Sequence, residues 1–567
     1  MTDSVDDGLS EEYANVAALL PGMAKAVPTQ RAVVFPEGRD REGHVAYTQL
    51  TFEQLDRESD VLAHGLARRG IVAGTRVLMM VRPGLEFAAL TFALFKVGAV
   101  PILIDPGMRK KWLLDCIRDA KPEAMIAIPL AHAVRCLVPG PFKTVRLHIT
   151  VGSRWFWGGL NLADLRRDAP QMPFSIARTR RGDRAAILFT SGSTGVPKGV
   201  VYQHGMFVEQ TRWIQEHYGI MPGEIDMPAF PLFALFSAAM GMTCVIPDMD
   251  PTRPASVDPR RIVEAIQNQG VTNTFGSPAL WKVVGTHCRA HQLKLPSIKR
   301  ILMAGAPVSP TIMELFEGVL SPEAEIHTPY GATESLPIAS ISHREVLDET
   351  AEKTRRGEGT CVGKALPGAD IQIIRIGDEP IDEFLEDLVL PEGEVGEITV
   401  RGDVVTREYF EKPEATAGAK MRDGSSIRHR MGDLGYKDSQ GRIWFCGRKA
   451  HRVMTADRLL FTVCCEAIFN EHPRVAKTAL VGIGSPPAQR PVLVVEPEIG
   501  EFSSSPVRQE EFRAQLLRLG QIHEHTRGIR DILFHRSLPV DSRHNVKIHR
   551  EELATWAERE IEGVSRP

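Results

Sequence analysis

The strongest constraint on the fold is an alternation of short apolar runs with helix-length segments. From Arg76 the chain reads RVLMMV, LEFAALTFALFKVG and AVPILID, and the rhythm resumes at Arg184 with RAAILFT. Such alternation is typical of βαβ units, whose parallel strands are covered by helices on both faces. The pattern therefore predicts an α/β fold with two doubly wound lobes.

The second lobe is expected to contain four helices, over 204–219, 258–269, 277–293 and 309–320, with strands between them. Ligands of doubly wound sheets bind beyond the carboxyl ends of the strands. Thr190, Gly305 and Tyr330 each follow a predicted strand, so we expect them at one binding edge.

The pattern changes after about residue 360, where IQIIRI, VGEITVR and RIWFCG are separated by Gly, Pro and acidic turns. These short alternating runs favour a small antiparallel or barrel subdomain over about 360–446. From 448 the chain has strands of its own and helices near 507–519 and 549–560. We therefore predict an N-terminal domain, 1–447, and a smaller α+β C-terminal domain, 448–567.

Composition limits the function classes. The 567 residues carry a net charge of −3, which provides no overall attraction to nucleic acid or to an anionic membrane. The eight cysteines show no CxxC pair, and the acidic N-terminus has no apolar run after a basic start, so it is not a signal peptide. These features predict a cytoplasmic enzyme that does not bind nucleic acid.

Two segments admit more than one interpretation. Residues 227–247 carry no charge, but Pro228, Pro231 and Pro247 disfavour a continuous helix, so a buried pocket wall is preferred to a membrane-contacting element. No transmembrane segment is predicted, and peripheral membrane contact stays open. Residues 342–359 are highly charged, which favours a mobile surface insertion, with a lid or docking surface as the alternative.

The stretch FTSGSTGVPKG, residues 189–199, predicts an anion-binding loop, because backbone N–H groups, hydroxyls and a lysine surround its glycines. It is not a Walker loop, since Lys198 follows Pro197 and precedes Gly199. Its candidate phosphate-binding residues are Thr190, Ser191, Gly192, Ser193, Thr194, Gly195 and Lys198.

Five further motifs follow in order: AGAPVS (304–309), YGATE (330–334), HRMGDLG (429–435), GR (447–448) and LPVDSRHNVKIHR (538–550). Together with the loop they resemble the AMP-forming acyl-adenylate synthetases, the superfamily of acyl-CoA ligases, luciferases and peptide-synthetase adenylation domains. The resemblance covers nearly the whole chain. It implies MgATP as cosubstrate, activation of a carboxylate as acyl-AMP, and a C-terminal domain that moves.

The resemblance also implies roles for individual residues. Gly305, Ala306 and Pro307 lie in the nucleotide-base loop, while Tyr330 and Gly331 begin the aromatic motif, in which Tyr330 presents its ring to adenine. Thr333 contacts phosphate, and Glu334 coordinates magnesium, which prefers oxygen ligands. Asp433 accepts hydrogen bonds from the ribose hydroxyls, and Arg448 contacts the nucleotide. Lys547 stabilises the charge that develops during adenylation.

The chain departs from the superfamily pattern at several positions: Val546 bears on the shape of the loop around Lys547, and the others concern the acceptor of the acyl group. Val546 replaces a glycine before Lys547, and TADRLLF stands where the glycines of a thiol tunnel are expected, beside Ala450 at the hinge. Ala234 in PLFALF replaces a histidine of many acyl-CoA ligases. Glycine loss removes the close backbone approach that lines such a tunnel, so thioester formation is not favoured.

The deviating hinge loop, RHNVKIHR and the charged insertion resemble the β-lactone synthetases of bacterial long-chain olefin biosynthesis. This resemblance implies a 2-alkyl-3-hydroxy fatty acid substrate, ring closure by its 3-hydroxyl, and association with other olefin-pathway enzymes. Apolar stretches around 230–242 and 275–281 suit alkyl chains or a core. His204 is a candidate base, with structural packing as the preferred alternative. The alternatives are an acyl-CoA ligase, acyl transfer to a carrier protein, and a catalytically weak ATP-binding scaffold.

Overall fold

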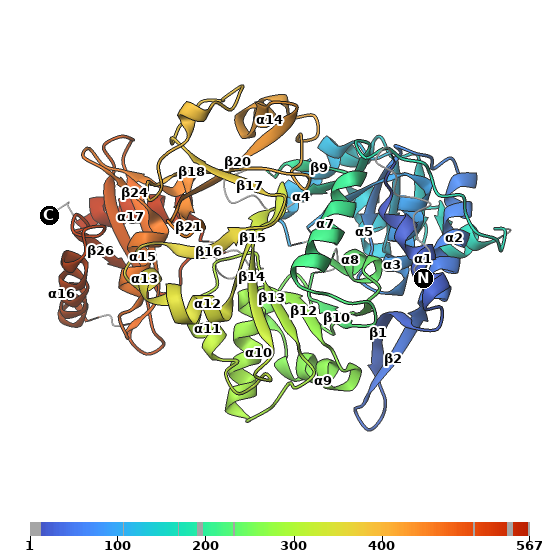
Figure 1. Ribbon diagram of the computed structural model, residues 1–567, viewed down its shortest axis with the longest axis horizontal. Coiled ribbons are helices and arrows are strands. Elements are labelled where there is room, and N and C mark those ends of the chain that lie inside the picture. The colour runs from blue at the N-terminus through green and yellow to red at the C-terminus, as the bar shows by residue number, and fades with distance from the viewer. Residues whose placement is uncertain are drawn as a thin grey trace.

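The molecule contains two large sheets, flanked by helices, and a C-terminal part with a smaller sheet (Figure 1). The computed structural model describes residues 13–105, 107–167, 169–189, 197–230, 233–502, 505–540 and 548–564. Figure 1 shows most of the first lobe in blue to cyan, most of the second in green, apart from its blue strands within residues 31–51, and the C-terminal part in orange to red at the opposite end. The α/β architecture with a smaller C-terminal sheet agrees with the predicted fold class.

The first sheet is parallel except for its last strand, with the order β7-β6-β5-β3-β4-β8-β9 among the described residues. Side chains alternate between its faces, as a strand requires. In β8, Leu188 packs with helices α2 and α3, whereas Ile187 and Phe189 pack with α4 and α5. The strands are β3 (Arg76–Met80), β4 (Val100–Ile104), β5 (Ala124–Ala127), β6 (Leu147–Thr150), β7 (Leu160–Asn161), β8 (Arg184–Phe189) and β9 (Gly199–Gln203).

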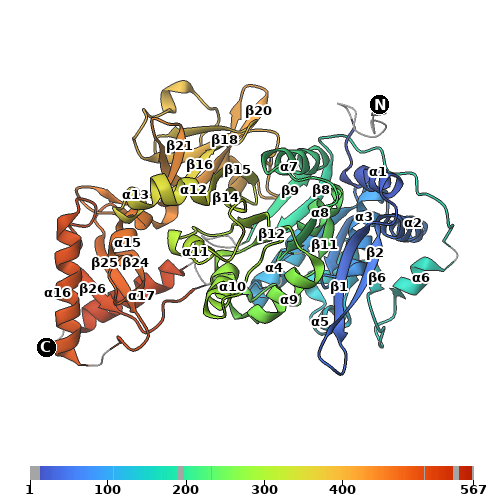
Figure 2. The same cartoon turned by 60° about the horizontal axis from the view of Figure 1, so that its bottom comes forward.

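The helices of this lobe follow the predicted alternation and lie on both faces of the sheet (Figure 2). Helix α3 is mostly apolar and buried from Phe87 to Val97, and its buried Lys96 pairs with Asp56 and Asp60 of α2. It ends at Gly98, whose φ of 76° is accessible to glycine. The helices are α1 (Leu19–Ala26), α2 (Phe52–Arg68), α3 (Leu85–Val97), α4 (Lys110–Ala120), α5 (Pro129–Leu137) and α6 (Leu162–Arg166).

The second sheet has a parallel half that belongs to the second lobe. The helix predicted over 309–320 is shorter, because the chain leaves helical geometry before Gly318, whose φ is 70°. The strands are β1 (Arg31–Arg39), β2 (Val45–Thr51), β10 (Ile225–Pro228), β11 (Thr243–Val245), β12 (Asn273–Gly276), β13 (Arg300–Met303) and β14 (Glu325–Ala332). The helices are α7 (His204–His217), α8 (Phe233–Ala239), α9 (Pro259–Gln269), α10 (Pro278–Ala290) and α11 (Pro310–Glu314).

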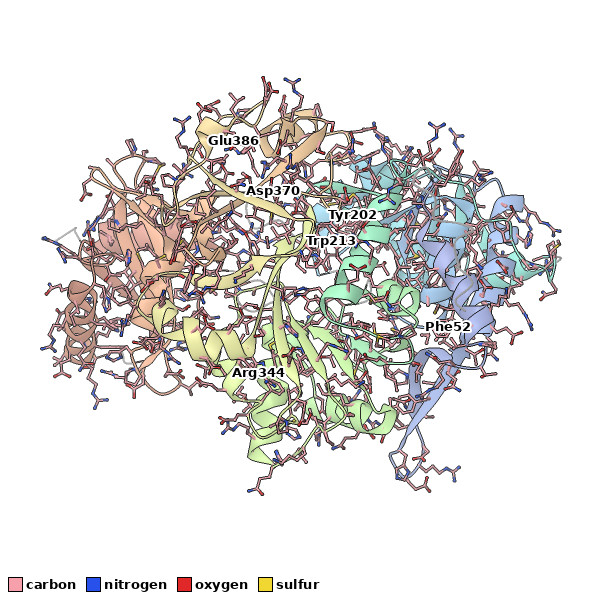
Figure 3. All side chains as sticks on the ribbon, viewed as in Figure 1. Phe52, Tyr202, Trp213, Arg344, Asp370 and Glu386 are labelled. Atoms are coloured by element: carbon pink, nitrogen blue, oxygen red, sulfur yellow. The ribbon has the colours of Figure 1, made fainter. Side chains whose placement is uncertain are left out.

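The strands predicted as a separate barrel belong to this same sheet, which they extend beyond β14 through antiparallel pairs. We call this part of the sheet, residues 335–448, the antiparallel arm. Helix α7 joins this antiparallel arm through Trp213, which packs where Gly368 and Gly402 leave room for its ring (Figure 3). The remaining elements are β15 (Ser335–Ser342), β16 (Thr360–Ala365), β17 (Asp370–Ile374), β18 (Gly396–Arg401), α14 (Pro413–Ala419), β19 (Lys420–Asp423), β20 (Ser426–Lys437) and β21 (Arg442–Arg448).

Residues after Arg448 form a three-stranded sheet of their own, with cores distinct from those of the lobes. This arrangement is what a separate domain requires, and the boundary at 447/448 stays a prediction. The elements are β22 (Val453–Met454), β23 (Leu459–Leu460), α15 (Thr462–Asn470), β24 (Val475–Ile483), β25 (Arg490–Pro497), α16 (Pro506–Ile522), β26 (Asp531–Phe534) and α17 (Arg550–Val564).

The charged segment 342–359 is folded and packed, which differs from the expected mobile surface insertion. It contains α12 (His343–Glu345), a π-helical turn (Val346–Thr350) and α13 (Ala351–Arg355). Val346, Thr350 and Ala351 are buried, and Gly357 approaches the backbone of α15 so closely that a side chain would clash. Its few apolar side chains share one helical face, which composition alone does not show.

The uncharged segment 227–247 forms a buried wall and not a continuous helix. It contains β10, α8 and β11, and Phe236, Met240 and Met242 are all buried. Pro231 lies outside the described residues. Among the helices described, none is long and apolar enough to cross a membrane.

Candidate active site

A cavity of about 2250 Å³ lies where the two lobes, the antiparallel arm and the C-terminal part meet. Each predicted site residue that the structure describes lines this cavity. These residues are Lys198, Gly305, Ala306, Pro307, Tyr330, Gly331, Thr333, Glu334, Asp433 and Arg448. Motifs that are far apart in the sequence therefore converge on one site.

The other predicted residues, Thr190, Ser191, Gly192, Ser193, Thr194, Gly195 and Lys547, lie outside the described residues. Their described chain neighbours identify the region. Phe189 and Lys198 flank the loop and line the cavity, as does Ile548, which follows Lys547. An ion pair of 2.5 Å between Arg109 and Glu552 joins the first lobe to the helix after Ile548.

Glu334 is held in the turn between β14 and β15. The Tyr409 hydroxyl donates a hydrogen bond of 2.7 Å to Glu334 Oε1. Burial, followed by the neighbouring Glu334 charge, raises the pKa of Tyr409, so its hydroxyl stays protonated and remains a donor. The Glu334 carbonyl accepts hydrogen bonds from the backbone N–H (2.8 Å) and Oγ1 (3.0 Å) of Thr406. The carboxylate is thus oriented before any ligand binds.

The same turn is held from the first lobe. The Tyr202 hydroxyl in β9 donates a hydrogen bond of 2.6 Å to the carbonyl of Thr333 (Figure 3 labels Tyr202). Gly331 must be glycine, because a Cβ there would lie 2.5 Å from the Ser335 carbonyl oxygen. The turn therefore depends on contacts from two distant parts of the chain, Tyr202 and the segment 406–409.

One lysine and two buried basic groups with lowered pKa lie on the side of the Glu334 turn that faces Tyr409 and Thr406. Lys198 Nζ lies 5.0 Å from the centre of the Tyr409 ring, a cation–π distance. The buried Lys420 donates a hydrogen bond of 3.0 Å from Nζ to Thr406 Oγ1, and burial lowers the pKa of Lys420 to about 7. Burial also lowers the pKa of His429, which lines the cavity, well below its ordinary value. Lys198 is placed to attract the anion for which its loop was predicted.

Asp433 is fixed by two partners across the sheet. Tyr330 donates a hydrogen bond of 2.7 Å from its hydroxyl to Oδ2, and Arg448 Nη1 lies 2.9 Å from Oδ1. Residues 433 and 448 are direct partners in β20 and β21, which explains the contact. Burial raises the pKa of Tyr330 well above its usual range. Tyr330 therefore orients this carboxylate, a role that its predicted adenine contact does not include.

The base loop 304–309 follows β13 at the carboxyl edge of the parallel half. Gly305 adopts φ 94°, which favours glycine, and so lets the chain turn along the cavity wall through Ala306 and Pro307. This is the edge at which doubly wound sheets bind nucleotides.

Together these groups can bind a polyanion joined to a ribose. Magnesium keeps several waters and uses one or two carboxylates plus substrate phosphates, so a single oriented carboxylate at Glu334 fits its needs. No cluster of three or more His, Cys, Asp or Glu side chains suited to a metal occurs among the described residues. Glu334 alone would leave the other coordination positions of a magnesium ion to water and phosphate oxygens.

His204 does not fit the role of base. It is fully buried, packs edge-on at 6.1 Å from the Phe95 ring, and is absent from the described cavity lining. Burial lowers its pKa to about 4. The structure supports the alternative, structural packing, because the helix that begins at His204 turns its first residue into the core.

The segment that replaces the expected glycines is a closed hairpin. The Thr455 hydroxyl donates a hydrogen bond of 2.6 Å to Asp457 Oδ1, and the Thr455 N–H donates one of 3.0 Å to the Arg458 carbonyl, so β22 and β23 meet in a tight turn. Arg458 Nη1 donates a hydrogen bond of 2.9 Å to the Glu524 carbonyl. Residues 453–460 do not line the described cavity.

The sequence did not indicate Tyr409, Tyr202, Thr406 or Lys420. Tyr409, Tyr202 and Thr406 contact the Glu334 turn from distant segments, and Lys420 contacts Thr406. None of the four belongs to a motif with a recognisable spacing. The sequence alone does not show that Tyr409, in REYFEKPEAT, contacts the YGATE motif, because this contact depends on the position of the β14–β15 turn.

The chain resembles known proteins over most of its length. A family model described as AMP-binding enzyme matches residues 23–410. The chain is 48% identical over 558 residues to an olefin beta-lactone synthetase of Xanthomonas campestris pv. campestris, covering 97% of this chain and 99% of that protein. It is 49% identical over 555 residues to the protein of the same name from Stenotrophomonas maltophilia, with the same coverage.

Among solved structures, an amide bond synthetase from Marinactinospora thermotolerans superposes with a TM-score of 0.76 and 22% identity. The match covers 95% of this chain and 99% of that one. At this identity the likeness shows the shared fold.

Proposed function

The chain belongs to the AMP-binding enzyme family, and on this premise we propose that it is an AMP-forming ligase that makes β-lactones. Its substrate is a 2-alkyl-3-hydroxy fatty acid, activated by ATP with magnesium, in long-chain olefin biosynthesis. The observation that carries the proposal is near-complete alignment, at 48% and 49% identity, with two olefin beta-lactone synthetases.

The first half-reaction joins the carboxylate to AMP. A carboxylate oxygen attacks the α-phosphorus of ATP, and the bond to the β-phosphate oxygen breaks, which releases pyrophosphate. We assign the phosphates to Lys198 and loop 190–195, the ribose to Asp433, and the developing charge to Lys547. Magnesium held by Glu334 would neutralise phosphate charge. The main contribution of these residues is positioning and electrostatic stabilisation.

The second half-reaction closes the ring within the substrate. The 3-hydroxyl oxygen attacks the acyl carbon, the hydroxyl proton is lost, and the bond to AMP breaks, giving a four-membered lactone. The hairpin 453–460 supports an internal acceptor, because side chains and a closed turn occupy the segment where a thiol tunnel would need glycine.

The deciding test is incubation of the purified protein with MgATP and a 2-alkyl-3-hydroxy fatty acid, with and without CoA. We expect AMP release and lactone ring-proton signals by NMR in both samples. A product that forms only with CoA would instead identify an acyl-CoA ligase, and mass added to a carrier protein would identify acyl transfer.

Lys547→Ala separates catalysis from ATP binding. If Lys547 stabilises the negative charge that develops during adenylation, the variant should lose most of its adenylation rate but still bind ATP. Adenylation at the wild-type rate would remove Lys547 from the mechanism.

We also propose a cytoplasmic enzyme that associates with product-consuming enzymes of the same pathway. The eight cysteines are all free thiols, as a reducing compartment requires. A product with two alkyl chains is poorly soluble, which favours direct transfer to a partner.

The packed segment 342–359 is a candidate docking surface, because it carries exposed charged residues such as Arg344 (Figure 3). Co-purification of partner enzymes with a variant in which the charges of residues 344 and 345 are reversed tests this role.

A further inference from the structure

The cavity reaches both faces of the first sheet. Met79 and Leu188 belong to the core cluster of helices α2 and α3, whereas Met80 and Phe189 lie on the opposite face, toward α4 and α5. All four side chains line the cavity. Because neighbouring residues of a strand point to opposite faces, the cavity must pass around the carboxyl edge of this sheet.

On one face the cavity extends along helices α7 and α8. We call this region the α7 arm, and its wall consists of buried apolar or aromatic side chains. They are Phe207, Ile214, Tyr218, Phe236 and Met240. The α7 arm is therefore closed from solvent at these residues.

On the other face the cavity extends along α4 and α5, and we call this region the α4–α5 arm. Figure 2 shows these two helices lower in the view than α2 and α3. Every described residue that α4 and α5 contribute to the lining is apolar, although both helices also carry charged residues. The lining residues are Trp112, Leu113, Leu114, Ile117, Leu130, Ala131 and Val134.

The α4–α5 arm is not simply part of a packed core. Trp112, Leu113 and Ile128 stay only partly buried although they pack against the core cluster of this face. A close-packed interior would cover such side chains. Toward the outside, Leu130 is 66% and Val134 37% exposed while both line the cavity, so this arm opens to the surface.

A branched lipid explains two apolar arms that diverge from one polar centre. In a 2-alkyl-3-hydroxy acid, adjacent carbons beside the carboxylate carry one chain each, so the chains separate where the reaction takes place. Resting on the function proposed above, we propose that the substrate straddles the carboxyl edge of the first sheet, with one alkyl chain in the α7 arm and the other in the α4–α5 arm.

Ala131→Phe tests this assignment, because Ala131 is a small, buried residue of the α4–α5 arm. The substrates are acids with two decyl chains, with the 2-chain shortened to methyl, and with the 3-chain shortened to methyl. Lactone and AMP formation provide kcat/KM for each. For the acid with two long chains we expect kcat/KM of the variant to fall by about tenfold or more. For the acid in which the chain that occupies the α4–α5 arm is shortened to methyl, kcat/KM should stay near the wild-type value.

Two further variants keep the test decisive. Ala133→Phe makes the same change on the same helix at a residue outside the described lining, and should behave as wild type with all three acids. Val134→Trp narrows the arm at a partly exposed position, so it tests the arm even if Ala131→Phe does not fold. It should show the same chain dependence with a smaller loss.

The outcomes separate the two proposals. The two-arm assignment would be overturned if kcat/KM fell equally with all three acids, or if the loss did not depend on which chain is short. It would also be overturned if neither variant lost activity. If wild type forms AMP but no lactone, ring closure fails, and chain-dependent AMP release still reports on the α4–α5 arm. If wild type uses none of the acids, the proposed function itself is wrong.

Discussion

The two ends of the cavity are built in opposite ways. At the end proposed to bind the nucleotide, called the nucleotide end, Glu334 and Asp433 are each held by hydrogen bonds or ion pairs from distant segments. At the end proposed to bind the alkyl chains, called the acyl end, the α7 and α4–α5 arms are lined mainly by apolar side chains whose contacts are not directional. The difference teaches that position is critical at the first end and that shape and volume are critical at the second.

This contrast predicts unequal responses to substitution. A misplaced charge at the nucleotide end loses an interaction that depends steeply on distance. An apolar wall tolerates replacement if volume is kept. Four experiments can sharpen or break the comparison, in order of decreasing expected effect.

Glu334→Gln should cause the largest loss. The amide keeps the shape and still accepts from Tyr409, but it removes the charge that fits magnesium, so adenylation should fall on the order of a hundredfold or more. Pyrophosphate release over a range of magnesium concentrations measures it. If a high magnesium concentration fully restored the adenylation rate of the variant, Glu334 would be supported as a magnesium ligand. If the variant had the wild-type rate at every concentration, that role would be excluded.

Asp433→Asn should mainly weaken nucleotide binding. The carboxylate accepts from Tyr330 and pairs with Arg448, and an amide can serve only as a weaker, neutral acceptor. A lost hydrogen bond to a charged group costs roughly 2 kcal/mol, so the Kd for ATP should rise by about thirtyfold. Calorimetric titration with ATP measures it, and an unchanged Kd would contradict the ribose assignment.

Tyr409→Phe should have a smaller effect on the same end. It removes the hydrogen bond to Glu334 Oε1 but keeps the ring beside Lys198. The orientation of one carboxylate is worth about 1 kcal/mol, so adenylation should slow roughly fivefold. Tyr202→Phe is the matched control for the Thr333 side of the turn. Wild-type rates in both variants would show that the turn is held by its backbone alone.

Asp226→Asn should have the smallest effect, visible in stability. Asp226 departs from the apolar character of the acyl end: burial raises its pKa from 3.8 to about 6, while Ser237 Oγ (2.5 Å) and Asn273 Nδ2 (2.7 Å) donate hydrogen bonds to it. The folded protein binds this proton more tightly than the unfolded chain, so stability falls as pH rises from about 4 to about 6.

The Asp226→Asn variant has no such titration, because an amide does not ionise in this range. Relative to the variant, the wild-type Tm should therefore drop by a few degrees between about pH 4 and pH 7, as measured by calorimetry. If Tm changed with pH in the same way in both proteins, folding would not raise the pKa of Asp226, and the prediction would be wrong.

The contrast between the two ends also explains which features could be predicted. Glu334, Asp433 and Lys198 stand in ordered motifs, because anion and ribose binding needs particular residue types at particular strand ends. Trp112, Leu130 and Phe236 carry no such signal, since apolar side chains serve a core and a cavity equally. His204 shows the limit of proximity in sequence: it lies close to the phosphate loop, yet its helix directs it into the core.

The sequence by itself determined the α/β alternation, the change to antiparallel strands and the ordered nucleotide motifs, because periodicity and special residue types are local properties. Only the tertiary structure decided that Tyr409 and Tyr202 hold the Glu334 turn, that segment 342–359 packs against α15, and that the cavity divides around the first sheet. These features arise from contacts between segments far apart in the chain, and such contacts exist only after the lobes have packed.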